Sequence, residues 1–198
     1  SVFISLFVYI VIVNAINLID GVDGLAGGIG FLACLTFGIW FQLSGISYLA
    51  IISLSLAGAL AGFLIFNFSP ARIFMGDSGS LTVGAIITFL SIRLIETPTK
   101  AVPEVFANVN TAVLAMAILA YPLIDTLRVF MIRARKGVSP FAADKNHIHH
   151  RLLSFGYDHR KTTLILYGFT VVVILTALFV PIKDPTLNFV VSLGTAVL

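Results

Sequence analysis

The sequence predicts an all-α protein that crosses a membrane several times. Of its 198 residues, 59% are hydrophobic and 11% are charged, and the mean hydropathy is +1.06, far above that of a soluble domain. Its apolar runs are continuous and lack the two-residue alternation of a membrane β-barrel. We therefore expect a polytopic bundle of transmembrane helices, with about six complete spans and a truncated one.

The expected spans are apolar runs that approach about 20 residues, the length that crosses a hydrocarbon core of about 30 Å. They lie near residues 1–13, 25–43, 48–66, 80–95, 110–132, 162–180 and 187–198. Pro122 should kink the fifth of them. Because the first run starts at Ser1 and the last stops at Leu198, we expect residues 1–198 to be a single, partial membrane domain of a longer protein.

Positive charge predicts the orientation of these spans, because Lys and Arg accumulate in cytoplasmic loops. Eight of the twelve basic residues fall between Arg128 and Lys161. We therefore expect a large cytoplasmic loop at about residues 133–161. Counting spans outward from this loop puts 14–24 and 67–79 on the same face, and 44–47, 96–109 and 181–186 on the other.

The first polar segment is "NAINLIDGVDG", in which Asn14, Asn17, Asp20 and Asp23 recur at every third position. If the helix continues through them, they share one face. The alternative is a solvated loop in which the two acids cap the next helix. Capping does not explain four polar groups at membrane depth, so we expect a functional site.

The second polar segment is "NFSPARIFMGDSGSLTVG", residues 67–84. Pro70 cannot continue a helix, and the turn at 76–79 places the carboxylate of Asp77 and free backbone N–H groups at the start of a span. This arrangement suits Mg²⁺, which binds through one or two carboxylates while phosphate oxygens complete its shell. The alternative is that Asp77 or Ser78 only caps a helix that begins at Ser80.

The third segment, residues 133–161, holds all four His, and His147, His149 and His150 form "HIHH", the histidine motif. Zinc is disfavoured because adjacent residues on a helix point apart and no Cys lies nearby. Imidazoles beside Arg151 and Lys145 suit an anionic diphosphate better. Attraction to anionic lipid is the alternative, but it explains the Arg and Lys and not the clustered His.

Asp125 lies near the inner end of its expected span, three residues before Arg128. That spacing predicts an ion pair along the helix, a structural role. Together, the three segments place carboxylates, amides and cations on one membrane face. They predict a cytoplasmic-facing site at which a soluble phosphorylated compound meets a component of the bilayer.

The motifs "NAINLIDGVDGLAGG", "FNFSPARIFMGDSGSL" and "DKNHIHHRLL", in this order, resemble those of the polyprenyl-phosphate N-acetylhexosamine-1-phosphate transferases, glycosyltransferase family 4. The resemblance implies transfer of GlcNAc-1-phosphate from UDP-GlcNAc to undecaprenyl phosphate, with release of UMP, to start a cell-envelope polymer. It also implies Mg²⁺ or Mn²⁺, a bacterial inner membrane, contact with membrane lipid, no nucleic acid and, by analogy, a homodimer.

The resemblance assigns roles to residues by their place in the motifs. Asp77 matches a Mg²⁺-binding aspartate, and the "HIHH" residues match a motif near the diphosphate and sugar. Asn67 and Phe74 match positions that contact the uracil, Phe74 by stacking. We expect catalytic roles for Asp20, Asp23, Asp77, His147, His149 and His150, and substrate binding by Asn14, Asn17, Asn67, Phe74 and Arg151.

Family members also carry an aspartate pair in an earlier cytoplasmic loop, and no segment of this sequence matches it. We expect that pair upstream in the parent protein. The spelling "HIHH" resembles the branch that uses UDP-GlcNAc (the WecA and TagO type), with the muramoyl-pentapeptide branch of peptidoglycan synthesis as the alternative.

Two alternatives belong to other classes of protein. An ion or solute transporter would need polar residues near the midplane or on both sides of the membrane. A scaffold whose basic loop docks a partner would leave the Asp and Gly motifs unexplained.

Overall fold

Every regular element of the described residues is a helix. The computed structural model describes residues 2–96, 102–137 and 146–180, together with 184, 186, 187, 190, 191 and 194. The helices are α1 (Val2–Leu18), α2 (Leu25–Leu43), α3 (Ser47–Asn67), α4 (Gly76–Glu96), η2 (Glu104–Phe106, a 3₁₀ turn), α5 (Thr111–Ile118), α6 (Ala120–Arg135), α7 (Ile148–Ser154) and α8 (His159–Phe179). The prediction of an all-α chain is confirmed.

Four of these helices are long and apolar enough to cross a membrane: α2, α3, α4 and α8. The pair α5 and α6 becomes a fifth span if the two are counted together, and α1 is a shorter apolar helix of 17 residues. The described residues therefore contain four or five candidate spans, fewer than the six expected, in a multi-pass membrane bundle. Most of the expected span at 187–198 lies outside the described residues.

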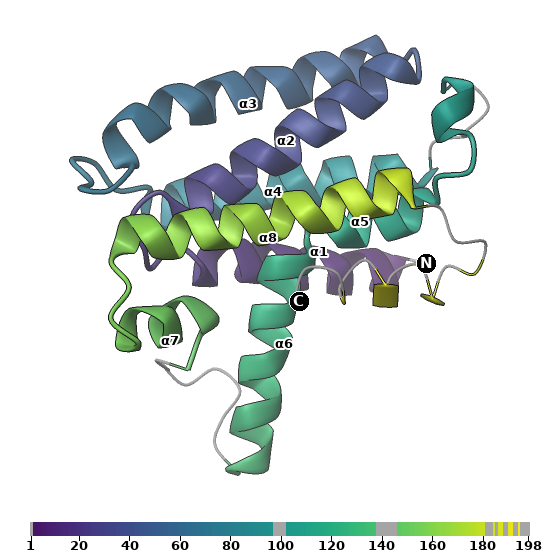
Figure 1. Cartoon of the computed structure of the whole chain (residues 1–198). Helices are drawn as coiled ribbons and strands as arrows, with labels where there is room; N and C mark the ends of the chain where they lie inside the picture. The colour runs from purple at the N-terminus through teal and green to yellow at the C-terminus, as the bar shows by residue number, and fades with distance from the viewer. Residues whose placement is uncertain are drawn as a thin grey trace.

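The span expected at residues 110–132 is broken rather than kinked at its proline. The axes of α5 and α6 differ by 69°, and the break lies at Leu119. Pro122 has no N–H for the carbonyl of Ile118, and its ring would clash with that carbonyl in a continuous helix. The chain therefore restarts as α6 at Ala120, where a first-turn proline is tolerated. Figure 1 shows α6 leaving the bundle at a steep angle.

Close packing of α1 against α4 positions the polar end of the bundle. A Cβ on Gly84 would lie 3.0 Å from the backbone of Val13, so the two helices touch where a side chain would crowd the neighbouring backbone. Small residues at such crossings let membrane helices approach closely. Because the helices are antiparallel, Asn17 of α1, one turn beyond Val13, lies beside Ser80 of α4.

The connections gather at two ends of the bundle (Figure 1). The turn at 19–24, the loop at 68–75, α7 and the start of α8 lie at one end, and the turn at 44–46 and η2 lie at the other. This agrees with the sorting of segments by positive charge. Residues 97–101 and 138–145, parts of the two long connections named from the sequence, lie outside the described residues.

Candidate active site

The turn at residues 19–24, which we call the aspartate turn, lies at the centre of the site. Helix α1 ends at Leu18, so Asp20 and Asp23 lie on a turn and do not continue a helical face, contrary to the sequence-based expectation. Gly24 has φ 76°, a left-handed conformation that favours glycine, and it caps the start of α2. Asn14 is apart from the site: its exposed amide donates to the Ile10 carbonyl at 2.7 Å.

Asn17 connects the end of α1 to the start of α4. Its Nδ2 donates to Asp77 Oδ1 at 3.1 Å and to Ser80 Oγ at 2.8 Å. Helix α4 begins at Gly76 rather than at the expected Ser80, so Asp77 lies in the first turn of the helix and not at a cap before it. An acid in a first turn is favoured by the helix dipole, and this one remains exposed.

Asp20 and Asp77 form a pair of neighbouring carboxylates. Burial raises the pKa of Asp20 to about 6; a hydrogen bond from the Gly76 backbone opposes this, and the charge of Asp77 adds to it. Two carboxylates and the amide oxygen of Asn17 are hard oxygen ligands of the kind that Mg²⁺ and Mn²⁺ prefer. A divalent cation would offset the repulsion between the acids, so the donor set fits such an ion.

Asp23 ties the aspartate turn to two other segments. Its Oδ2 accepts from the Ala71 N–H at 3.2 Å, and its backbone carbonyl accepts from Thr163 Oγ1 at 2.9 Å. Its Oδ1 lies 3.4 Å from Nδ1 of His159. Sequence reasoning did not single out His159, because the residue stands apart from "HIHH" and is placed only by tertiary contact.

The side chain of Asn67 points into the protein. Its side chain is 4% exposed; its Oδ1 accepts from the Gly24 N–H at 3.1 Å, and its Nδ2 donates to the Ile73 carbonyl at 2.8 Å. The residue therefore joins the aspartate turn to the 68–75 loop. The uracil contact expected for its side chain stays a prediction. Phe74 on that loop is 77% exposed and available for stacking.

Helix α7 brings the histidine motif to the aspartate turn. A Cβ on Gly21 would lie 3.2 Å from Nε2 of His149 and 3.9 Å from Cε1 of His150. The three polar segments of the sequence thus meet at one end of the bundle. His147 and His149 are buried, His150 is half-buried and Arg151 is exposed; Lys145 lies outside the described residues.

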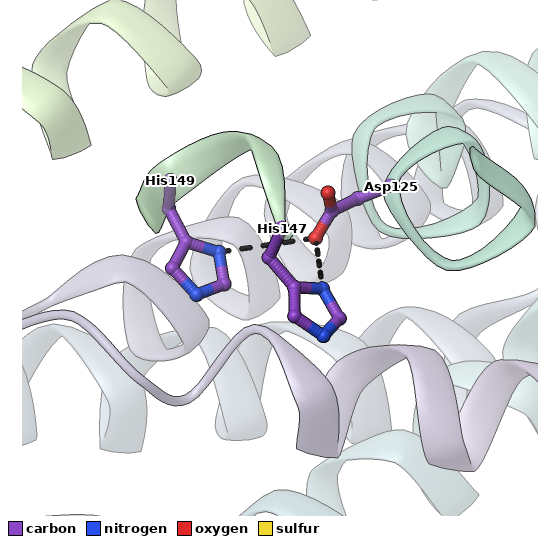
Figure 2. A group of neighbouring side chains, drawn as sticks. All are labelled: Asp125, His147 and His149. Atoms are coloured by element: carbon purple, nitrogen blue, oxygen red, sulfur yellow. Dashed lines mark hydrogen bonds and ion pairs between the residues drawn. The ribbon is translucent and has the colours of Figure 1, made fainter. Parts of the chain in front are cut away.

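The carboxylate of Asp125 on α6 points toward two of the histidines (Figure 2). Its Oδ2 lies 2.8 Å from Nδ1 of His147 and 3.8 Å from Nδ1 of His149. The expected ion pair with Arg128 is wrong: among the described residues Asp125 contacts α7, and Arg128 donates instead to the Asn146 carbonyl.

Asp125, His147 and His149 also have ligand atoms within 4.8 Å of one another. Two ligands of one tetrahedral zinc ion, each at about 2.0–2.1 Å, lie about 3.3 Å apart. The 2.8 Å between Asp125 and His147 is instead a hydrogen-bond length. The expectation that His149 and His150 point apart was wrong, since their rings lie 4.4 Å apart. The distances around Asp125 nevertheless describe a hydrogen-bonded group rather than a zinc site.

His149 is held neutral. Burial lowers its pKa to about 4; the charge of Asp125 opposes this, and His150 and His147 add to it. Its Nδ1 lies 3.2 Å from the Tyr121 hydroxyl, and its buried Nε2 has no hydrogen-bond partner among the described residues. At neutral pH this ring supplies hydrogen bonding and packing, and no positive charge.

The chain is similar to several known proteins. Residues 1–95 match the family model described as Glycosyl transferase family 4. The decaprenyl-phosphate N-acetylglucosaminephosphotransferase of Mycolicibacterium smegmatis is 36% identical over 84% of this chain and 44% of its own length. That of Mycobacterium leprae is 36% identical over 100% of this chain and 52% of its own length.

A more distant relative has the same kind of name. The undecaprenyl-phosphate alpha-N-acetylglucosaminyl 1-phosphate transferase of Escherichia coli is 29% identical over 83% of this chain and 44% of its own length. The chain thus spans about half the length of the curated relatives it matches. The family model covers the two aspartate-bearing segments, and the relatives extend the match across most of the chain. The chain belongs to glycosyl transferase family 4.

Proposed function

We propose that this protein transfers N-acetylglucosamine 1-phosphate from UDP-GlcNAc to a polyprenyl phosphate such as undecaprenyl phosphate. One observation carries the proposal: Asn17, Asp20 and Asp77 meet the histidine motif at one end of a membrane bundle. A site at that place suits a reaction between a water-soluble donor and a lipid acceptor. The relatives named above are phosphotransferases of N-acetylglucosamine that act on prenyl phosphates.

Mg²⁺, or Mn²⁺ in its place, is the cofactor of this proposal. The carboxylates of Asp77 and Asp20 and the amide oxygen of Asn17 would hold it. When bound, such an ion neutralises charge on a diphosphate and polarises its phosphorus–oxygen bonds. The repulsion between the two acids supports the assignment.

The proposed chemistry is one displacement at phosphorus. An oxygen of the lipid phosphate forms a bond to the β-phosphorus of UDP-GlcNAc, the bond from that phosphorus to the bridging oxygen breaks, and UMP leaves with the electron pair. The exposed ring of Phe74 would stack on uracil, and the Arg151 guanidinium and the half-buried His150 are placed to bind the diphosphate.

We place the site on the cytoplasmic side of a bacterial inner membrane. The support is the charge at this end: Arg128, Arg133, Arg151 and Arg160 all belong to the segment from the end of α6 to the start of α8. Basic residues are retained on the cytoplasmic side. UDP-linked sugars would then reach the aspartate turn directly from solution.

The experiment uses membranes from cells that express the gene encoding this chain. They receive radiolabelled UDP-GlcNAc, undecaprenyl phosphate and Mg²⁺, and label in the lipid fraction is counted. Asp77→Asn should reduce the rate by about 100-fold or more, because it removes a metal ligand. The matched control is Asp158→Asn, an exposed carboxylate that caps α8 by accepting from the Lys161 N–H at 2.7 Å.

Four outcomes are informative. Label that requires both Asp77 and a divalent cation supports the proposal, and Mn²⁺ should replace Mg²⁺ after EDTA treatment. A near-normal rate in Asp77→Asn removes that residue from the metal role. Label from UDP-MurNAc-pentapeptide alone moves the protein to the muramoyl branch. No labelled lipid with either donor, while immunoblotting confirms the protein, contradicts the transferase.

A further inference from the structure

The carboxylate of Asp125 is fully buried, and both of its oxygens contact residues of the histidine motif. Its exposed fraction is 0%. Its Oδ2 lies 2.8 Å from His147 Nδ1, and its Oδ1 accepts from the Ile148 N–H at 2.7 Å. A buried carboxylate is costly unless both oxygens are hydrogen-bonded. Both partners here belong to the residues that begin α7, so this interaction ties α6 to the start of that helix.

Asp125 does not act by itself. Tyr121, Asp125 and Arg128 recur at spacings of four and three, so they lie on one face of α6, which we call the α6 stripe. Arg128 donates to the Asn146 carbonyl, and the Tyr121 hydroxyl lies 3.2 Å from Nδ1 of His149. Each of the four consecutive residues 146–149 is therefore held by a side chain of the stripe.

Helix α7 needs such support. It has seven residues, and isolated helices of that length are marginal in water because nucleation is costly. The N-cap residue His147 offers no side-chain hydrogen bond to its own helix. Asp125 supplies the missing cap from another helix by accepting the Ile148 N–H.

The same contact fixes the tautomer of His147. An ionised carboxylate only accepts hydrogen bonds, so the proton of a neutral His147 ring must be on Nδ1. Nε2 is then the unprotonated nitrogen, free to accept a proton or a hydrogen bond. The ring of His147 stacks on that of His149 at 5.3 Å, which keeps its plane fixed.

We infer that Asp125, with the α6 stripe around it, is the positioning residue of the histidine motif: it holds α7 against the aspartate turn and directs the proton of a neutral His147 ring to Nδ1. The inference rests on the proposed function for its kinetic consequence and on geometry for the rest. It assigns Asp125 a role in place of the ion pair with Arg128. The bend between α5 and α6 directs the stripe toward α7, so the break between these helices contributes to the position of the histidine motif.

Asp125→Asn is the test variant, because it preserves shape and removes one acceptor. The amide oxygen can accept from Ile148 N–H or from His147, but the amide nitrogen then faces the other group as a donor. We expect the ring of His147 to change tautomer, so that its proton moves to Nε2. Loss of an orienting carboxylate costs about 10- to 100-fold in activity, and we expect the loss in kcat rather than in KM for the donor.

Two measurements test the expected change of tautomer and the expected loss in kcat. The ¹⁵N chemical shifts of His147 in labelled full-length protein, assigned with His147→Gln, report which ring nitrogen carries the proton. The transfer assay reports kcat and KM. Asp158→Asn is the control, since it makes the same chemical change at another helix cap; its rate should stay within about twofold and its His147 signals should be unchanged.

The outcomes separate this inference from the proposed function. An inactive wild type contradicts the transferase, while the ¹⁵N shifts still decide the positioning role. If Asp125→Asn keeps both the wild-type tautomer and the wild-type kcat, Asp125 is not the positioning residue. If that variant does not fold, Tyr121→Phe removes only the hydroxyl beside His149: a fall in kcat at constant KM supports the stripe, and unchanged kinetics overturn it.

Discussion

Gly21 shows at the scale of one residue why the aspartate turn contains glycines. A Cβ there would lie 3.2 Å from Nε2 of His149, closer than ordinary van der Waals contact. The missing side chain lets α7 pack directly on the backbone of the turn. Glycine at this position therefore serves the approach of two segments of the site.

We predict that Gly21→Ala shifts α7 by a few tenths of an ångström and that Gly21→Val displaces it further. Overpacking of this kind costs about 1–3 kcal/mol, so the valine variant should lose the transfer activity and unfold at a lower temperature. The measurements are the radiolabel assay and thermal unfolding of the purified protein. Gly62→Ala is the control, because a Cβ at Gly62 meets no atom within 4 Å. Full activity in Gly21→Val would contradict the contact.

Helix α7 carries a buried histidine whose titration should couple the position of the helix to pH. Burial lowers the pKa of His149 to about 4 from its ordinary value of 6.5; the charge of Asp125 opposes this shift, and His150 and His147 add to it. The Tyr121 hydroxyl also faces the ring. Between the two pKa values, an undocked α7 binds more protons than a docked one, so acidification favours undocking. Above about pH 6.5 the ring is neutral in both states and adds no pH dependence.

We therefore predict that α7 is docked at neutral pH and loosens as pH falls from about 6.5 toward 4, with a total effect on the order of 3 kcal/mol. Hydrogen exchange of residues 148–154, measured at about pH 7.5 and about pH 5 and corrected for intrinsic rates, reports the docking. His149→Phe removes the titrating group and should flatten the difference. If the pH dependence of hydrogen exchange is the same in His149→Phe as in the wild type, another titrating group causes it.

The whole molecule has a polar end that holds the site and an opposite end that holds the 44–46 turn (Figure 1). The basic residues between Arg128 and Lys161 predict that the polar end faces the cytoplasm. Ser47 and Ser154 are exposed at opposite ends, so they make a matched pair for labelling. Cys34 is buried and can be replaced by Ala to give a cysteine-free background.

In that background, Ser47→Cys should react with a membrane-impermeant maleimide added to intact spheroplasts. Ser154→Cys should react only after the inner membrane is opened, because we expect its end of the bundle to face the cytoplasm. The reverse pattern would invert the topology and place the site away from UDP-sugars. The homodimer expected by analogy stays a prediction, and crosslinking of the same cysteine variants tests it.

Much of the candidate site could be predicted because its signals are local. Asn17, Asp20, Asp77 and the histidine motif stand in short polar segments between apolar runs, and the charge count sorts those segments to one end. The contacts that residues make with distant partners were not predicted. His159 meets Asp23 across 136 positions, and Asn67 points inward because its partner is Gly24.

The sequence by itself determined that the chain is an all-α membrane bundle with its polar chemistry at one end. The reason is that the hydropathy and charge of each segment decide whether it lies in the membrane or at one of its faces. The tertiary structure decided how that chemistry is held. Proline chemistry explains why α5 and α6 separate, but only packing sets the 69° bend and the meeting of Asp125 with His147. Two segments of the chain that are separated along the sequence can exchange hydrogen bonds only after the helices between them are placed, and no local pattern records that placement.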